Sequence, residues 1–131
     1  MKYFCIVLFM ALSTFTMYGQ QPEDKEKKLR ESIDASLEKY EKTLDLEGWQ
    51  VFYLDSILTH DYGAMMIELE EKSKAKVENS DIYMQVQDKW MEQMYNSVHK
   101  VLNDEQWNKY LKQGARRDKK ERDKRESKRN R

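Results

Sequence analysis

Apolar residues recur at helical spacing along most of this chain. Between residues 22 and 44 they fall three or four positions apart, at Leu29, Ile33, Leu37, Tyr40 and Leu44. A single apolar stripe on a segment otherwise covered with charge predicts an amphipathic α-helix. Residues 45–48 interrupt the stripe and predict the end of that helix.

The stretch 49–59 is more apolar, and its apolar residues cover more than half of a helix circumference. We expect this helix to pack on two sides, at the centre of the core. Residues 59–63 predict a turn or kink, because Asp61 can cap a helix and Gly63 can break one. A third helix is expected over 64–77. The fourth follows a cap signal at residues 79–81, with its stripe at Ile82, Val86, Trp90, Met94, Val98 and Val101.

A capping signal opens one more helix. Asn103 can cap it and Gln106 can reach back, while Leu102 can pack on Trp107 as a hydrophobic staple. Residues 116–131 contain no apolar side chain, so this segment can be helical through ion pairs but cannot be core. The pattern predicts an all-α protein, a bent helical hairpin or a small bundle of four to five helices.

The first residues have the order of a secretory signal peptide. One positive charge precedes the apolar run 4–12, and a short, more polar stretch ends at Gly19. The run is too short to span a bilayer. We predict a signal peptide over 1–19, with cleavage after Gly19 or after Gln20, and a periplasmic protein without membrane association; an uncleaved anchor is the alternative. The single cysteine, Cys5, lies inside this segment, so the mature chain would have no thiol.

Charge divides the mature chain in two. Residues 20–115 hold 13 basic and 20 acidic side chains, whereas residues 116–131 hold 10 basic and 4 acidic ones. We therefore expect a helical domain over 20–115 and a basic tail over 116–131. Acids alternate with the bases of the tail, which favours a solvated helix over a nucleic-acid or lipid site. Folding of the tail onto the acidic body in a dimer is a further possibility.

Candidate chemistry is sparse. Ser56, His60 and Asp61 lie close in sequence, but no strained nucleophile turn or oxyanion loop accompanies them. We expect no enzyme activity and no cofactor. Methionines at 65, 66, 84, 91 and 94, with His60 and His99, could hold a soft metal ion. Their spacing has no ligand-pair pattern, and flexible core is the commoner role of such methionines, so we predict no metal site.

Aromatic residues are numerous for so polar a chain, and a thin helical layer cannot bury all of them. We expect some to line an exposed apolar groove that binds other proteins; a monomer core or a dimer interface is the alternative. The candidate client-binding set is Trp49, Phe52, Tyr53, Trp90, Met91, Met94, Tyr95, Trp107 and Tyr110.

Two pentapeptides share the frame Leu-x-x-x-Gln, each at the start of an expected helix. Their motif residues are Leu46, Gln50, Leu102, Asn103 and Gln106. This arrangement resembles the LTXXQ-motif family, the Spy/CpxP-type periplasmic stress proteins, although Glu47 and Asn103 stand where that family has threonine. The resemblance implies a thin, bent helical hairpin that forms an antiparallel homodimer and holds unfolded proteins on its concave face without ATP.

The expected function is therefore that of a periplasmic ATP-independent chaperone-like or stress-response protein. Its partners would be unfolded or partly folded proteins, or a specific envelope protein, and not nucleic acid. Two alternatives stay open: a metal-responsive sensor of the same fold, and a structural accessory subunit with one tight partner.

Overall fold

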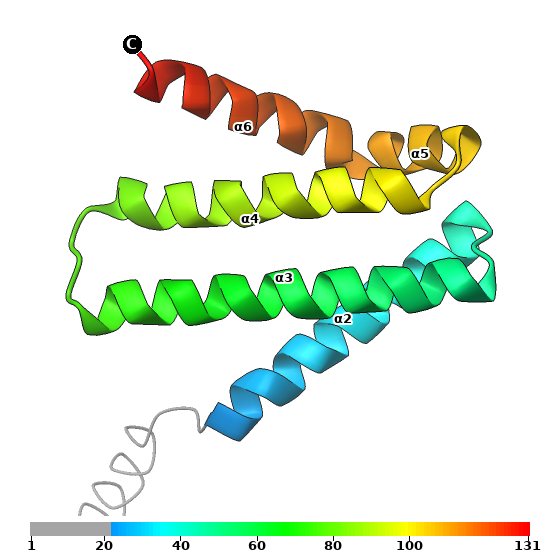
Figure 1. The fold of residues 1–131 in the computed structure, drawn as a ribbon, viewed down its shortest axis with the longest axis horizontal. Coiled ribbons are helices and arrows are strands. Elements are labelled where there is room, and N and C mark those ends of the chain that lie inside the picture. The colour runs from blue at the N-terminus through cyan, green and yellow to red at the C-terminus, as the bar shows by residue number, and fades with distance from the viewer. Residues whose placement is uncertain (1–21) are drawn as a thin grey trace, which may run out of the picture.

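The computed structural model describes residues 22–131, so the expected signal peptide lies outside the described residues. Five α-helices and one π-helical segment make up this part of the chain, which has no strand (Figure 1). They are α2 (Pro22–Leu44), α3 (Gly48–Lys74), α4 (Ser80–Val101), α5 (Asp104–Tyr110), η2 (Leu111–Ala115) and α6 (Arg116–Arg129). The prediction of an all-α small bundle is confirmed.

Helices α3 and α4 form an antiparallel hairpin (Figure 1). Helix α2 crosses α3 at an angle and contacts α5 as well, and α6 runs back along the outer side of α4. Helix α3 therefore contacts both α2 and α4. The prediction that its apolar first half is packed on two sides is wrong, because its buried residues form one stripe and Trp49, Phe52 and Tyr53 are exposed. The short helix α5 and the segment η2 make the turn between α4 and α6.

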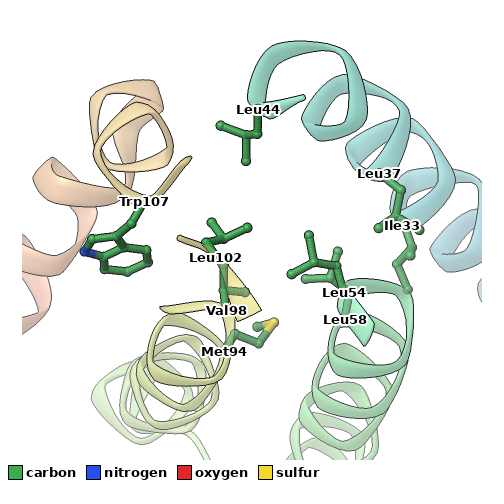
Figure 2. Close-up of a cluster of buried hydrophobic side chains, with 9 residues drawn as sticks. All are labelled: Ile33, Leu37, Leu44, Leu54, Leu58, Met94, Val98, Leu102 and Trp107. Atoms are coloured by element: carbon green, nitrogen blue, oxygen red, sulfur yellow. The ribbon is translucent and has the colours of Figure 1, made fainter. Parts of the chain in front are cut away.

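The core lies in the half of the hairpin nearest the α2–α3 and α4–α5 connections (Figure 2). It is formed by Ile33, Leu37, Leu44, Leu54, Leu58, Met94, Val98, Leu102 and Trp107. The predicted stripes of the first and fourth helices supply five of these side chains, and the predicted staple between Leu102 and Trp107 supplies two more. In these elements periodicity identified the buried faces correctly.

The predicted turn at residues 59–63 is wrong, because α3 continues through it without a break. The Asp61 side chain is only 3% exposed and bonds between helices instead of capping one. Its Oδ1 accepts hydrogen bonds from Nε2 of Gln93 on α4, at 2.9 Å, and from Nδ1 of His60, at 2.7 Å. A buried polar contact to α4 thus outweighs the weak helix propensity of Gly63.

Continuity of α3 gives a direct prediction for Gly63. An added Cβ would meet no atom within 4 Å, and glycine inside a helix is about 1 kcal/mol less favourable than alanine. Gly63→Ala should therefore raise the free energy of unfolding by about 1 kcal/mol, measured by urea denaturation with circular dichroism. Gly48→Ala, at the first position of α3, is the control and should give a smaller gain. Destabilisation by Gly63→Ala would show that α3 breaks there.

Candidate functional site

Gln50 and Gln106 are paired through their side-chain amides, although 56 residues separate them. Nε2 of Gln50 donates to Oε1 of Gln106 at 2.7 Å, and Nε2 of Gln106 donates to Oε1 of Gln50 at 3.0 Å. Both side chains are buried, at 3% and 7% exposure. Buried amides need such partners because an unpaired one costs about 1–3 kcal/mol.

Each glutamine of this pair also closes its own helix start. Oε1 of Gln50 accepts from the backbone N–H of Glu47 at 3.0 Å, and Oε1 of Gln106 accepts from that of Asn103 at 3.0 Å. Asn103 completes the predicted capping box, since its Oδ1 accepts from the backbone N–H of Gln106 at 2.8 Å.

The second N–H of each amide donates to the backbone carbonyl of the residue just before the opposite motif. Nε2 of Gln50 donates to the carbonyl of Val101 at 3.0 Å, and Nε2 of Gln106 donates to that of Asp45 at 3.4 Å. Each of these carbonyls lies five residues before the glutamine of its own motif. The two Leu-x-x-x-Gln frames therefore form one approximately two-fold polar cluster, which we call the glutamine pair.

An exposed aromatic face begins one residue before Gln50. Trp49, Phe52 and Tyr53 are 53%, 68% and 54% exposed, and we call them the aromatic face. Their rings touch edge to face, with centroids 6.2 Å apart for Trp49 and Tyr53 and 5.8 Å for Phe52 and Tyr53. The carboxylate of Glu47 accepts a hydrogen bond from the Trp49 indole. The three rings lie outward because Gln50 and Leu54 point inward on the same turns.

The same side of α3 carries a second exposed apolar residue. Ile67, which is 62% exposed, lies 18 residues after Trp49, five helical turns and about 27 Å along the axis. Side chains between them on this side include Ser56, Gly63 and His60, and the His60 side chain is 71% exposed. The outer side of α3 thus has exposed apolar groups at both ends and a polar ring between them.

The other predicted client-binding residues do not join the aromatic face. Met94 and Trp107 are in the core, at 3% and 8% exposure. Trp90 is half-buried, and its indole donates to the Glu68 carboxylate at 2.7 Å. Met91, Tyr95 and Tyr110 pack partly buried against the core. Sequence periodicity placed all of them on helix faces but could not tell which faces meet solvent.

The histidines engage neighbouring side chains. His60 contacts Asp61, and the ring of His99 stacks on Trp107 with centroids 3.9 Å apart. Residues 22–131 contain no group of three or more His, Cys, Asp and Glu side chains placed to hold a metal ion.

The basic tail forms α6 and docks on α4 by charge. Lys119, Arg122, Arg125 and Arg129 face α4, whereas most of the other side chains of α6 are exposed. Their partners are acids of α4: Glu92 for Lys119 and Arg122, Asp88 for Arg125 and Arg129, and Asp81 for Arg129. The tail is helical, as the sequence allowed, but it is not fully solvated.

The stripe on α6 was the signal that sequence reasoning missed. Its four cations recur at intervals of three, three and four, the period of a buried helix face, but they carry charge instead of apolar groups. Arg122 is only 7% exposed, and its guanidinium lies over the Tyr95 ring at 5.5 Å from the centroid. Charge complementarity, not apolar burial, therefore holds α6 in place.

Asp88 is the acid at the centre of this contact. Burial opposes its ionisation, but hydrogen bonds and charge from Arg125 and Arg129 outweigh burial and lower the pKa of Asp88. Its side chain is 12% exposed, and the pair to Arg125 is bidentate, at 2.7 and 2.9 Å. Such pairs are stronger than single surface ion pairs.

Within residues 22–131 no helix is long and apolar enough to cross a membrane. Comparison with protein-family models, with curated proteins and with solved structures finds no match to the chain.

The glutamine pair should be the most costly polar contact to remove. Gln50→Ala and Gln106→Ala should each lower the free energy of unfolding by about 1–3 kcal/mol, because each leaves the other amide buried without its hydrogen-bond partner. In the double variant the two losses should not add, because the residues are coupled by about 0.5–3 kcal/mol. Urea denaturation of the unaltered chain, the two single variants and the double variant measures this double-mutant cycle. Exposed Gln87→Ala is the control, and additive losses would mean that the two amides do not interact.

Docking of α6 should depend on ionised Asp88. Because the pKa of Asp88 is lower in the folded protein, its ionised carboxylate stabilises the docked state at every pH above the ordinary aspartate pKa. This stabilisation is lost as the pH falls through the lowered pKa of the folded protein. Docking should persist at neutral pH, begin to weaken as the pH falls below about 4, the ordinary aspartate value, and fail only below the lowered pKa of Asp88. Asp88→Asn, or about 1 M salt, should speed hydrogen exchange across residues 116–129 at neutral pH. Exposed Glu31→Gln on α2 is the charge-matched control. Unchanged exchange in Asp88→Asn would contradict an ionic attachment.

Proposed function

We propose that the protein is an exported, ATP-independent holdase-like chaperone or stress-response protein that binds unfolded or partly folded proteins. The observation that carries this proposal is the aromatic face: three large aromatic side chains, each more than half exposed, adjoin one another on the first turns of α3. Exposed apolar patches of this kind favour protein–protein interaction. Export rests on the expected signal peptide.

The shape of the surface favours many clients over one. The outer side of α3 carries exposed apolar groups near both of its ends, so it can contact an extended chain at several separate points. Aromatic rings supply contact area at a low loss of side-chain entropy. Loose contacts of this type suit binding and release without ATP.

Charge around the surface would assist release and solubility. Residues 20–115 carry an excess of seven acids, and the Glu47 carboxylate adjoins the Trp49 ring. Net charge keeps a protein with exposed apolar groups soluble. The resemblance of the two glutamine motifs to the LTXXQ-motif family points to the same function.

The test is light scattering of an aggregation-prone reporter enzyme during thermal unfolding, without ATP and with a chelator present. Residues 20–131 should suppress aggregation at a roughly equimolar ratio. The variant Trp49→Ser, Phe52→Ser, Tyr53→Ser should lose most of this suppression. Its free energy of unfolding should change little, because exposed substitutions usually lie within about 0.5 kcal/mol each.

A matched control replaces three exposed polar residues at the other end of α3: Glu70→Ser, Glu71→Ser, Lys74→Ser. It should retain suppression. Absence of suppression by the unaltered chain would contradict a holdase function, and an equal loss in both triple variants would remove the assignment to the aromatic face. Suppression that appears only with Cu or Zn would favour the metal-responsive alternative.

A further inference from the structure

One row of cations on α6 takes no part in the contact with α4. It consists of Arg116, Lys120, Lys124 and Lys128, which follow one another at intervals of four residues. All four are exposed, and the ion pairs that α6 makes within residues 22–131 involve none of them. We call this row the basic ridge. Because α6 lies on the outer side of α4, the ridge is at the surface of the bundle (Figure 1).

Helical geometry places the acids of α6 outside the ridge. Steps of four residues advance about 40° around an α-helix, so the ridge covers about 120° of the circumference. Two of the acids, Asp118 and Asp123, are each paired with a cation that is not part of the ridge, at 3.4 and 2.7 Å. Glu121, at the edge of the ridge, opposes its four cations with one charge. Acids and bases that alternate in the sequence are therefore separated on the surface.

The ridge is unfavourable for the helix that carries it. Like charges four residues apart repel one another on a helix surface, and the ridge contains three such pairs in succession. Elsewhere in the described chain, lysines pair with acids at this spacing: Lys42 with Glu38 at 2.7 Å, and Lys74 with Glu70 at 3.2 Å. A helix that needed only solubility would gain from that arrangement. The ridge is better explained by an anionic partner outside the chain.

The surroundings of the ridge favour a flat anionic surface over a nucleic acid. Helix α4 lies along α6, so α6 can present only one side to a partner (Figure 1). The DNA major groove admits a single helix between its two backbones, and the adjoining α4 with its acids would prevent entry. Single strands are held by stacking on aromatic rings, and residues 116–131 contain none. Lipid headgroups lie in a plane and can meet the ridge along about 18 Å.

The acidic body of the protein does not cancel the charge of the ridge. Residues 20–115 carry an excess of seven acids, but acids of α4 that adjoin α6 are neutralised by its inward cations. The ridge points away from the helices beneath it, and one helix diameter is about 10–12 Å. The screening length at physiological ionic strength is about 8 Å, so the field of the remaining acids is weak at the ridge.

We propose that the basic ridge binds the anionic headgroups of a lipid bilayer and holds the protein at a membrane surface. This peripheral adsorption needs no spanning helix, and it does not depend on the holdase function. It differs from the expectation drawn from the sequence, in which alternating charges indicated a solvated tail. Each Lys or Arg at an anionic surface strengthens adsorption about fivefold, so four cations give a Kd on the order of 1 mM in accessible lipid.

The test is cosedimentation of residues 20–131 with lipid vesicles at about 0.15 M salt. Vesicles of phosphatidylcholine with about one third phosphatidylglycerol should sediment half of the protein at on the order of 1 mM accessible lipid. Vesicles of phosphatidylcholine alone should bind at least about tenfold more weakly, because they lack the anionic charge. About 1 M salt, which shortens the screening length to about 3 Å, should release the protein from the anionic vesicles.

Substitutions in the ridge locate the contact. The triple variant Lys120→Gln, Lys124→Gln, Lys128→Gln should bind anionic vesicles about 100-fold more weakly, since it loses three cations at about fivefold each. Replacement of the same three lysines by arginine keeps the charge and should change binding less than about threefold. Circular dichroism should show unchanged helix content in both variants, because the three side chains are exposed.

A matched control changes net charge equally without touching α6. The variant Lys25→Gln, Lys27→Gln, Lys28→Gln removes three exposed cations from the start of α2. It should bind anionic vesicles within about threefold of the unaltered chain, because these lysines lie on a helix with neighbouring acids and outside the ridge.

Any of four results would overturn the proposal. The first is no binding to anionic vesicles at about 10 mM lipid, well above the expected Kd. The second is equal binding to neutral vesicles, which would assign adsorption to an apolar surface. The third is an equal loss in the α2 variant, which would leave only net charge. The fourth is tighter binding, per phosphate, to a short DNA duplex. None of these outcomes bears on the holdase assay, because the aromatic face is on α3 and the ridge is on α6.

Discussion

The reciprocal amide contact between Gln50 and Gln106 is the interaction on which the rest of this bundle depends. It joins the first turn of α3 to the first turn of α5 and holds the α2–α3 connection beside the α4–α5 connection. Each amide also satisfies backbone groups that a helix start leaves unpaired. The two connections can therefore be buried side by side without unpaired polar groups, and the hydrophobic core forms directly next to them, around Leu44 and Leu102 (Figure 2).

The position of the candidate binding surface follows from the same contact. With Gln50 directed inward, the 100° step of an α-helix directs Trp49, Phe52 and Tyr53 outward on the same turns. The aromatic face therefore lies at the end of the molecule that holds the glutamine pair. At the other end of the α3–α4 hairpin Val86 is buried, and ion pairs with Asp88 attach α6. The first end combines the glutamine pair with apolar burial, whereas the second depends more on charge, so salt and acid should weaken the second end more.

Periodicity was sufficient to predict the helices, their buried stripes and the cap at Asn103, because these depend on residues close in sequence. It failed at residues 59–63, where Asp61 is recruited by Gln93 from another helix. It also could not pair Gln50 with Gln106, since the motif spacing says nothing about which helix starts meet in space. The cations of α6 suggested only a solvated helix, because a charged stripe becomes a packing face only when a matching acidic stripe lies opposite. Among the aromatics, Trp107 and Phe52 were both expected on the client-binding surface, yet Trp107 is core and Phe52 is exposed.

The most direct test of this account is nuclear magnetic resonance of the side-chain amides in residues 20–131. If the glutamine pair organises the bundle, the amide protons of Gln50 and Gln106 will show mutual Overhauser effects and will exchange with water far more slowly than those of exposed Gln87. If both amides exchange as fast as Gln87 and show no contact with each other, the two helix starts are not joined. The arrangement of core, aromatic face and tail derived from that junction would then be wrong.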